Sequence, residues 1–406
     1  MNWKQKIILT SITILGVSLS SSTVWAGYPA LPELLANILL KQPEQKLLQG
    51  FKDIQNAQYS LSQNWLGGDV DVIVNHENDA LTDNEKVKNW QLGVEFPIAL
   101  SRQRQAEQLV GTAYNQYISS QQNYLKWLAS AKLRDLLWQY KISQIQTSAA
   151  QNALLKSRAL HLKVSKKVKA GESPEIDLLL ANKEIFKHQK EFVDQQTLLE
   201  IAKNNFQVWT QTNQLPENII ESTIENSHLD QHPEILKLRS QLEINQSELI
   251  KVKSYSKESP RIFLGAKNDH DSNTNNTALV FQLSVPLGIN PSNDVHIAKQ
   301  NQSIYEQQAK IERAKIELQQ TIYQAKQELS SAYFAIRFSE KQFRIAQKAL
   351  NMSETAYQLG ESNIQNLLLV QQQTLNAKLE FELAKARQGH AIAIFNQVSG
   401  NILGAQ

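Results

Sequence analysis

The sequence predicts a mainly α-helical protein with membrane β-strands, built from two copies of a unit containing a helix, a β-hairpin, a very long helix and a return helix. Three observations predict this class. Short landmarks recur at a nearly constant offset, two helical stretches are too long for a globular domain, and a pair of strands with alternating apolar residues precedes each long helix. The 406 residues are sufficient for two such copies.

Residues 1–26 have the pattern of a secretory signal peptide. Lys4 and Lys6 precede an apolar run from Ile7 to Val17, and Ala26 ends a cleavage site with small residues at the required positions. The run is shorter than the ~20 residues of a transmembrane helix, and we expect no such helix further along the chain. Export with removal of this segment is therefore expected, and an uncleaved anchor is the less favoured alternative.

Composition excludes several function classes. The chain has 42 basic and 39 acidic residues, a net charge of +3, without the concentrated basic patch of a nucleic-acid-binding protein. It has no cysteine, which excludes a disulfide framework, a thiol nucleophile and a thiolate metal site. Nucleophile-elbow, P-loop and zinc-protease motifs are absent from the sequence. We expect neither an enzyme nor a resident cofactor.

The internal duplication is defined by three pairs of landmarks in the same order. Two pairs are separated by 189 residues and one by 190. They are Gln42-Pro43-Glu44 with His232-Pro233-Glu234, Phe96-Pro97 with Val285-Pro286, and Gly171-Glu172-Ser173 with Gly360-Glu361-Ser362. We predict a first repeat over 27–229, with its tip near 171, and a second over 230–406, with its tip near 360.

Period-two alternation predicts strands at about 68–76, 87–97, 260–267 and 277–287. Their length is close to the ~9–11 residues that a tilted strand needs to cross a bilayer. The second strand of each copy places large apolar side chains on one face, and we predict that this face contacts lipid. These positions are Trp90, Leu92, Val94 and Phe96, and then Leu279, Phe281, Leu283 and Val285. A soluble hairpin with one buried face remains the alternative.

Helical spacing of apolar residues predicts the rest of each unit. The first helices are expected at 32–65 and 233–257, and the return helices at 174–212 and 363–399. Between them, residues 100–169 contain no proline and one glycine, which allows a helix of ~105 Å. A helix of this length requires coiled-coil packing.

Four strands cannot form a closed membrane barrel, because the smallest single-chain barrels have eight. An open sheet in lipid would leave its edge groups unpaired, at a cost of several kcal/mol for each group. If the hairpins enter a membrane, several chains must therefore share one barrel.

The order of elements resembles the TolC-like outer-membrane efflux proteins. The most specific similarities are the strand-to-helix junctions Val94-Glu95-Phe96-Pro97 and Leu283-Ser284-Val285-Pro286, and the two glycine turns. The resemblance implies a homotrimer in the bacterial outer membrane, with a twelve-stranded β-barrel continued through the periplasm by an α-helical barrel. It also implies two protein partners, a periplasmic adaptor (membrane fusion) protein and an inner-membrane RND-type pump.

The same resemblance implies the functional residues of the periplasmic tips. Seven positions correspond to the turns that meet the adaptor, namely Val168, Ala170, Gly171, Glu172, Leu359, Gly360 and Glu361. Asp177 and Asn366 correspond to the pore end, where an asparagine in the second copy departs from an acidic ring. The alternative for both glycines is helix termination alone, which every helical hairpin requires.

Histidine and lysine clusters have simpler interpretations. His228 and His232 are four residues apart, a spacing suited to a metal, but Pro233 disfavours a helix at His232. His270, between Asp269 and Asp271, is best interpreted as part of a solvated loop. The lysine run at 163–169 is interpreted as a solvated helix face.

The favoured function is a passive exit duct powered by a partner pump, for drugs or heavy-metal cations. The segment from Trp209 through Pro216 resembles most the CzcC-like heavy-metal branch. A type I protein-secretion channel remains an alternative within the same fold. A soluble periplasmic coiled-coil adaptor remains an alternative from another class.

Overall fold

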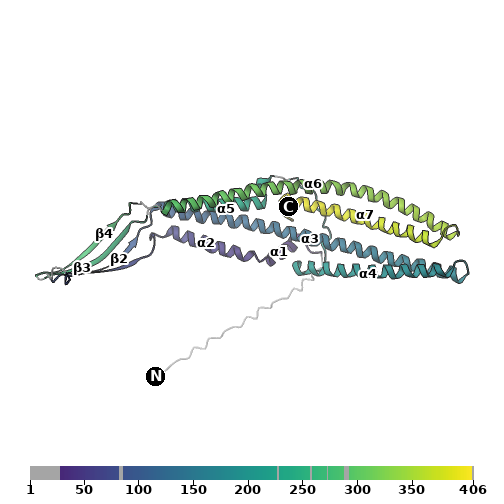
Figure 1. The fold of residues 1–406 in the computed structure, drawn as a ribbon, viewed down its shortest axis with the longest axis horizontal. Helices are drawn as coiled ribbons and strands as arrows, with labels where there is room; N and C mark the ends of the chain where they lie inside the picture. The colour runs from purple at the N-terminus through teal and green to yellow at the C-terminus, as the bar shows by residue number, and fades with distance from the viewer. Residues whose placement is uncertain are drawn as a thin grey trace, which may run out of the picture.

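A computed structural model describes residues 28–81, 86–225, 228–256, 258–271, 273–287 and 292–404. The predicted signal peptide, residues 1–26, lies outside these residues. The described chain is strongly elongated, with a β-sheet at one end and helical hairpins extending to the other (Figure 1).

The elements follow the predicted order twice, which confirms the duplicated unit. After α1 (Leu31–Lys41), the first copy contains α2 (Gln45–Gln63), β1 (Asp71–Asn78), β2 (Lys88–Pro97), α3 (Ser101–Lys169) and α4 (Glu175–Thr210). After the 3-10 turn η1 (Leu229–Gln231), the second contains α5 (Pro233–Ser254), β3 (Arg261–His270), β4 (Asn275–Ser284), α6 (Ser292–Gln358) and α7 (Ile364–Val398).

The single first helix expected over 32–65 is wrong, because the chain forms two helices there, α1 and α2. The break falls at Gln42, whose φ of −70° and ψ of 122° are extended. A residue before proline is disfavoured in the α region, so Pro43 ends α1. The corresponding Pro233 is the first residue of α5, a position where the missing N–H carries no cost.

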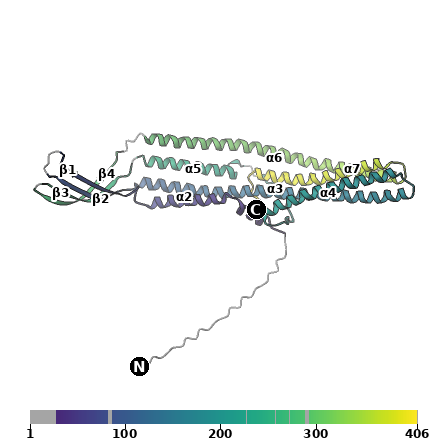
Figure 2. The same cartoon turned by 60° about the horizontal axis from the view of Figure 1, so that its bottom comes forward.

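The long helices α3 and α6 have 69 and 67 residues. At 1.5 Å per residue α3 is ~104 Å long, too long for a globular domain and stabilised by its neighbours along its whole length. It packs against α2 and α5 in the half near the sheet, and against α4 and α7 in the other half. Figures 1 and 2 show the resulting side-by-side helices.

The sheet is an antiparallel meander with strand order β1-β2-β3-β4. The central pair, β2 and β3, joins the two copies, and Gly93 lies opposite Gly265 in it. The strands β1 and β4 form the two edges. One chain therefore provides a continuous four-stranded segment with an open edge on each side.

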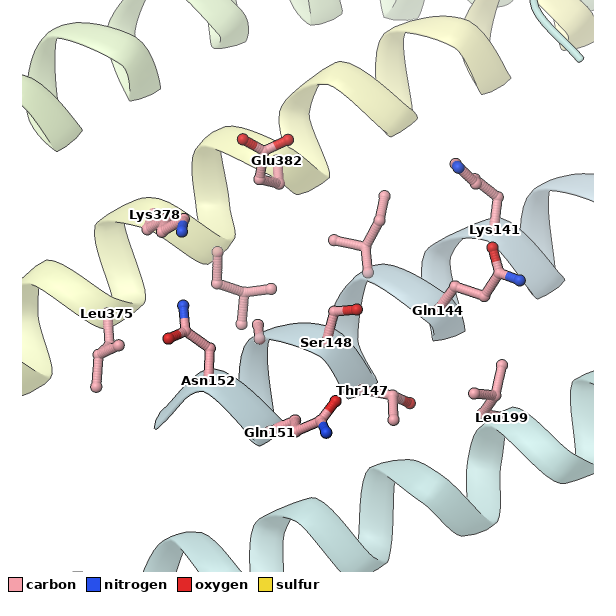
Figure 3. Close-up of a pocket in the computed structure, with 13 residues that line it drawn as sticks. Lys141, Gln144, Thr147, Ser148, Gln151, Asn152, Leu199, Leu375, Lys378 and Glu382 are labelled. Atoms are coloured by element: carbon pink, nitrogen blue, oxygen red, sulfur yellow. The ribbon is translucent and has the colours of Figure 1, made fainter. Parts of the chain in front are cut away.

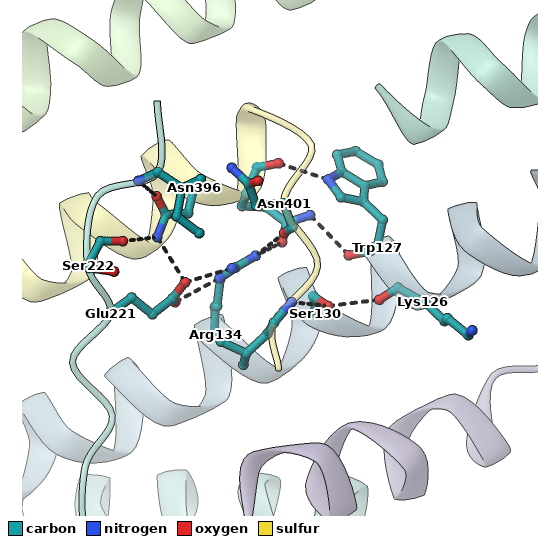
Figure 4. A network of polar contacts seen from close by, with 11 residues as sticks. Lys126, Trp127, Ser130, Arg134, Glu221, Ser222, Asn396 and Asn401 are labelled. Atoms are coloured by element: carbon teal, nitrogen blue, oxygen red, sulfur yellow. Dashed lines mark hydrogen bonds and ion pairs between the residues drawn. The ribbon is translucent and has the colours of Figure 1, made fainter. Parts of the chain in front are cut away.

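A buried polar network fixes the middle of the molecule (Figure 4). The Arg134 side chain on α3 is only 4% exposed and makes a bidentate pair with Glu221, with N–O distances of 2.8 and 2.7 Å. Its Nη1 also donates to the carbonyl oxygen of Asn401 at 2.9 Å. Asn396 on α7 donates to Glu221 and Ser222. The network thus holds linker residues 211–225 and residues 399–404, which follow α7, against one side of α3.

Candidate membrane face and channel tips

The sheet has one continuous apolar face. Because side chains alternate along a strand, the register places Leu92 beside Val74 and Ala266, and Leu264 beside Val94 and Phe281. These side chains are mostly exposed, Leu92 at 59% and Phe281 at 67%. An exposed apolar face that covers four strands indicates contact with lipid or with another protein surface.

The eight positions predicted to contact lipid differ in their surroundings. Six are exposed on this face, namely Trp90, Leu92, Val94, Leu279, Phe281 and Leu283. Phe96 is on the same face but is half-buried, because its ring packs edge-on against Trp65 at 5.7 Å between centroids. Val285 is exposed and lies just beyond the end of β4.

Aromatic rings lie towards both ends of the apolar face. His76 stacks on Trp90, with ring centroids 4.0 Å apart, near the hairpin loops. The Trp65–Phe96 pair lies near the helices. Amphipathic aromatic rings are enriched at both interfaces of a membrane, so this arrangement fits an embedded sheet.

The opposite face of the sheet is mostly polar and charged. Arg261 forms ion pairs with Asp71 and Glu95 across three strands. The ring of Phe263 lies over the paired glycines Gly93 and Gly265, and a Cβ added at either would come within 2.6 Å of that ring. In a closed barrel this face would line the interior.

The two tips have the same helix-ending geometry. Gly171 and Gly360 have φ of +76° and +78°, which L-residues rarely adopt. The Gly171 N–H donates to Val168 and the Glu172 N–H donates to Lys167, at 3.0 and 2.8 Å, which is a Schellman motif. A Cβ on either glycine would meet nothing within 4 Å. Space therefore does not require glycine there, whereas the backbone conformation does.

The other predicted tip residues surround these glycines. Ala170, Glu172, Leu359 and Glu361 are exposed, and Val168 is half-buried. At the predicted pore end, Asp177 accepts a hydrogen bond from Ser173. Asn366 occupies the equivalent place and donates to Ser362 at 3.0 Å.

A lysine connects the two hairpins at the tip. Lys167 on α3 donates to the Tyr357 carbonyl at the end of α6, at 3.2 Å, and its Nζ lies 4.8 Å from the centre of the Tyr357 ring. The last carbonyls of a helix lack intrahelical donors and attract cations. The contact therefore caps α6 and links the first hairpin to the second.

Two helices present exposed apolar stripes with seven-residue spacing. On α4 the stripe contains Leu179, Phe186 and Val193, and on α6 it contains Phe338, Ile345 and Met352. All six side chains are at least half exposed. Such spacing is the pattern by which helices pack in coiled coils.

The histidines of the predicted metal spacing lie in different surroundings. His228 is exposed, whereas His232 is 2% exposed and its Nδ1 accepts a hydrogen bond from the Glu234 N–H at 3.2 Å. Burial lowers the pKa of His232 to about 4, so the ring is neutral and caps α5. No group of three or more His, Asp and Glu side chains among the described residues is placed to hold a metal.

Among the helices of the described ranges, none combines the length and the apolar character that a membrane span requires.

Comparison with known proteins resolves the architecture. No protein-family model and no curated protein matches the sequence. Solved structures do match over nearly the whole chain. The outer-membrane channel OprN superposes with a TM-score of 0.71 at 13% identity, covering 91% of this chain and 89% of its own. The fold of this chain is that of an outer-membrane channel.

Two further structures with the outer-membrane channel fold agree. The Campylobacter jejuni channel CmeC has a TM-score of 0.68 at 12% identity, covering 98% of this chain and 94% of its own. The outer-membrane protein VceC from Vibrio cholerae has a TM-score of 0.67 at 13% identity, covering 91% and 96%. At these identities the likeness concerns the fold.

Sequence reasoning missed the features that depend on distant contacts. The Arg134 network joins residues 87 and 267 positions apart, and no local pattern signals it. The stripes on α4 and α6 had a signal, the seven-residue spacing of large apolar residues, which could have been found from the sequence.

Proposed function

We propose that this chain is the subunit of an outer-membrane channel that acts as the passive exit duct of a tripartite efflux system. The observation that carries the proposal is the exposed apolar face of a sheet with two open edges, continued by helices of ~100 Å. The apolar face suits the outer-membrane lipid, and the long helices suit a periplasmic tube. An apolar face of this kind counts against the soluble coiled-coil alternative.

A homotrimer closes the structure. Three copies of the four-stranded sheet make a twelve-stranded barrel in which the edge strand β4 of one chain pairs with β1 of the next, so no edge remains in lipid. The stripe on α4 then packs against the stripe on α6 of the neighbour. Both contacts are head-to-tail, the kind of contact that closes a ring when the rotation fits.

The chain would act as a conduit and not as an enzyme. In this proposal a periplasmic adaptor meets the tips at Gly171 and Gly360, the tip helices spread, and an inner-membrane RND-type pump supplies the energy. Substrate choice lies largely in the pump. Sensitivity of a deletion strain to zinc and cobalt, compared with its sensitivity to dyes, would separate the heavy-metal branch from drug export.

Cross-linking tests the ring directly, because the natural chain has no cysteine. Ile73→Cys on β1 would be combined with Val280→Cys on β4, or with cysteine at Ala278 or Gln282 on the same face to allow for strand stagger. Within one chain β1 and β4 are three strand spacings apart, ~14 Å, and a disulfide requires Cα atoms within ~7 Å. Only a disulfide between chains can form.

The expected result, by electrophoresis of the outer-membrane fraction, is a ladder of cross-linked species with one, two and three chains and none larger. When the disulfides are reduced, the trimer should dissociate on heating. The single Ile73→Cys variant is the matched control and should show no ladder. A monomer released with the periplasm would contradict the proposal, and a ladder continuing beyond three would contradict the closed ring.

A further inference from the structure

The half of α3 that leads to the tip carries an unbalanced positive charge. From Leu136 to Gly171 the chain has seven Lys and Arg residues and no Asp or Glu. The seven are Lys141, Lys156, Arg158, Lys163, Lys166, Lys167 and Lys169. None of them forms an ion pair within the part of the chain that the structure describes, whereas Lys187 and Lys190 on the adjacent α4 pair with Glu184 and Asp194.

At these seven positions the charge is restricted to one copy of the duplication. At the offset of 189 residues the seven positions correspond to Ser330, Ile345, Gln347, Met352, Thr355, Ala356 and Gln358. None of these residues is charged. A function shared by both tips therefore does not explain the lysines, and neither does a general need for solubility of long helices.

Five of these seven cations line two cavities at the seam between the hairpins. The upper cavity, ~660 Å³, lies between α3, α4 and α7 and is lined by Lys141 and Lys378 (Figure 3). The lower cavity, ~400 Å³, lies nearer the tip between α3, α6 and α7, and four lysines line it. They are Lys156, Lys163, Lys166 and Lys167.

Both cavities combine this charge with apolar walls. Leu199, Leu375 and Leu379 contribute to the upper cavity, and Leu160, Leu350 and Leu367 to the lower one. One acidic residue lines each cavity, Glu382 above and Glu354 below, and Glu382 is already paired with Lys385 at 3.2 Å. We call the two cavities together the seam groove.

The seam groove lies on one particular side of α3. Near the middle of the helix, this same side is covered by the linker that follows α4 and by the residues that follow α7. Ser130 and Arg134 contact those segments, and Lys141 and Ser148 line the upper cavity. Spacings of four, seven and seven residues place all four side chains on one side of the helix. A linker inside a conduit would obstruct it, so in the proposed channel this side faces outward, into the periplasm.

We infer that the seam groove is the docking site of an acidic α-helical segment of a periplasmic partner, an inference that rests on the proposed function. From Lys141 to Lys167 the groove runs ~39 Å along α3, the length of about seven helical turns. A helix lying there would place apolar residues against the leucines and Asp or Glu beside the lysines. Lys156 and Lys163 are seven residues apart, the spacing of flanking charges along a coiled coil.

The test uses the full-length protein in detergent and a synthetic helical probe of about four heptads, with Leu at the a and d positions and Glu at e and g. A matched peptide has Gln in place of Glu. Binding is followed by fluorescence anisotropy at low and high salt. We expect the Glu peptide to bind about tenfold or more tightly than the Gln peptide at low salt, and to lose this advantage at high salt.

Variants locate the binding. Lys163→Glu with Lys166→Glu should weaken the Glu peptide about tenfold or more, and Lys163→Gln with Lys166→Gln should weaken it less. The control, Lys341→Glu with Lys348→Glu, makes the same charge change at exposed lysines of α6 that do not line the groove. It should bind as the wild type does.

Three results would overturn the inference. In the first, the Glu and Gln peptides bind with equal affinity. In the second, the α6 control variant weakens binding of the Glu peptide as much as the variant at Lys163 and Lys166 does. In the third, an unstructured glutamate polymer of the same charge binds as tightly as the Glu peptide, which would mean that charge alone is recognised. The groove lies within one chain, so the assay applies even to a monomer. Failure to form a trimer would count against the proposed function, and failure of peptide discrimination in a heat-sensitive trimer would count against this inference alone.

Discussion

The most direct test of the membrane face compares two neighbouring residues of β2 that point in opposite directions. Leu92 is the fifth of ten residues in the strand and is 59% exposed on the apolar face, between Val74 and Ala266. Gln91 points to the opposite, polar face, between Asn75 and Lys267. Leu92→Arg and Gln91→Arg therefore introduce the same charge one residue apart, on the two faces of one sheet.

The magnitude follows from the position. An arginine on the lipid face costs ~2–4 kcal/mol near the bilayer midplane, so three copies cost roughly 6–12 kcal/mol for each trimer. This is comparable to the whole stability of a typical domain, ~5–15 kcal/mol. Gln91→Arg would instead face Lys267 in the barrel interior, where opposed like charges cost about 1 kcal/mol or less per pair. We expect Leu92→Arg to abolish most trimer formation and Gln91→Arg to preserve it.

The assay is the fraction of heat-dissociable trimer in the outer membrane, supported by urea titration of the protein refolded into lipid vesicles. If Gln91→Arg prevents assembly while Leu92→Arg does not, the face assignment is reversed. If both variants assemble as the wild type does, the sheet is not embedded, and the argument from the exposed apolar face is refuted.

Three further predictions concern the helical region. Gly171→Trp or Gly360→Trp should abolish export while trimers still insert. Alanine at the same sites carries the ~1–2 kcal/mol cost of positive φ without the bulk of tryptophan, so it separates backbone strain from blocked docking. Unchanged export by the tryptophan variants would contradict the tip assignment. The pKa of His232 is about 4 in the folded chain against 6.5 in the unfolded chain, so the contribution of His232 to stability is complete above pH 6.5 and is lost as pH falls towards 4. His232→Asn keeps an acceptor for the N-terminus of α5 and should flatten this part of the Tm–pH profile. An unchanged profile would exclude His232 as the cause. Arg134→Met should lower the free energy of unfolding by ~3–5 kcal/mol, because it leaves the Glu221 carboxylate, whose side chain is only 13% exposed, without its charged partner. Adding Glu221→Met should recover part of this loss in urea denaturation, and no recovery would mean that Arg134 acts through packing alone.

Much of the fold was predictable because its signals are local or periodic. The absence of proline between Pro97 and Pro174 predicted a helix of about 70 residues, and α3 has 69. Alternation at Trp90, Leu92 and Val94 predicted a strand with one apolar face, and the offset of 189 residues predicted the duplication. The positive φ of both tip glycines follows the same logic, since a helix that reverses sharply needs such a residue.

Other features were decided only by tertiary structure. Pairing of β2 with β3 across the two copies turns two hairpins into one sheet and aligns their apolar faces. Packing of α3 between α4 and α7 brings Lys141 and Lys378 to the same cavity, although they are far apart in the sequence.

The difference has a physical cause. Secondary structure and its amphipathic faces depend on side chains two to seven residues apart, which the sequence by itself specifies. The Arg134–Glu221 pair and the seam groove depend instead on which faces meet after folding. A lysine run can be a solvated helix face in isolation. It becomes a candidate docking site only when a second helix places apolar walls beside it and leaves its charge unpaired.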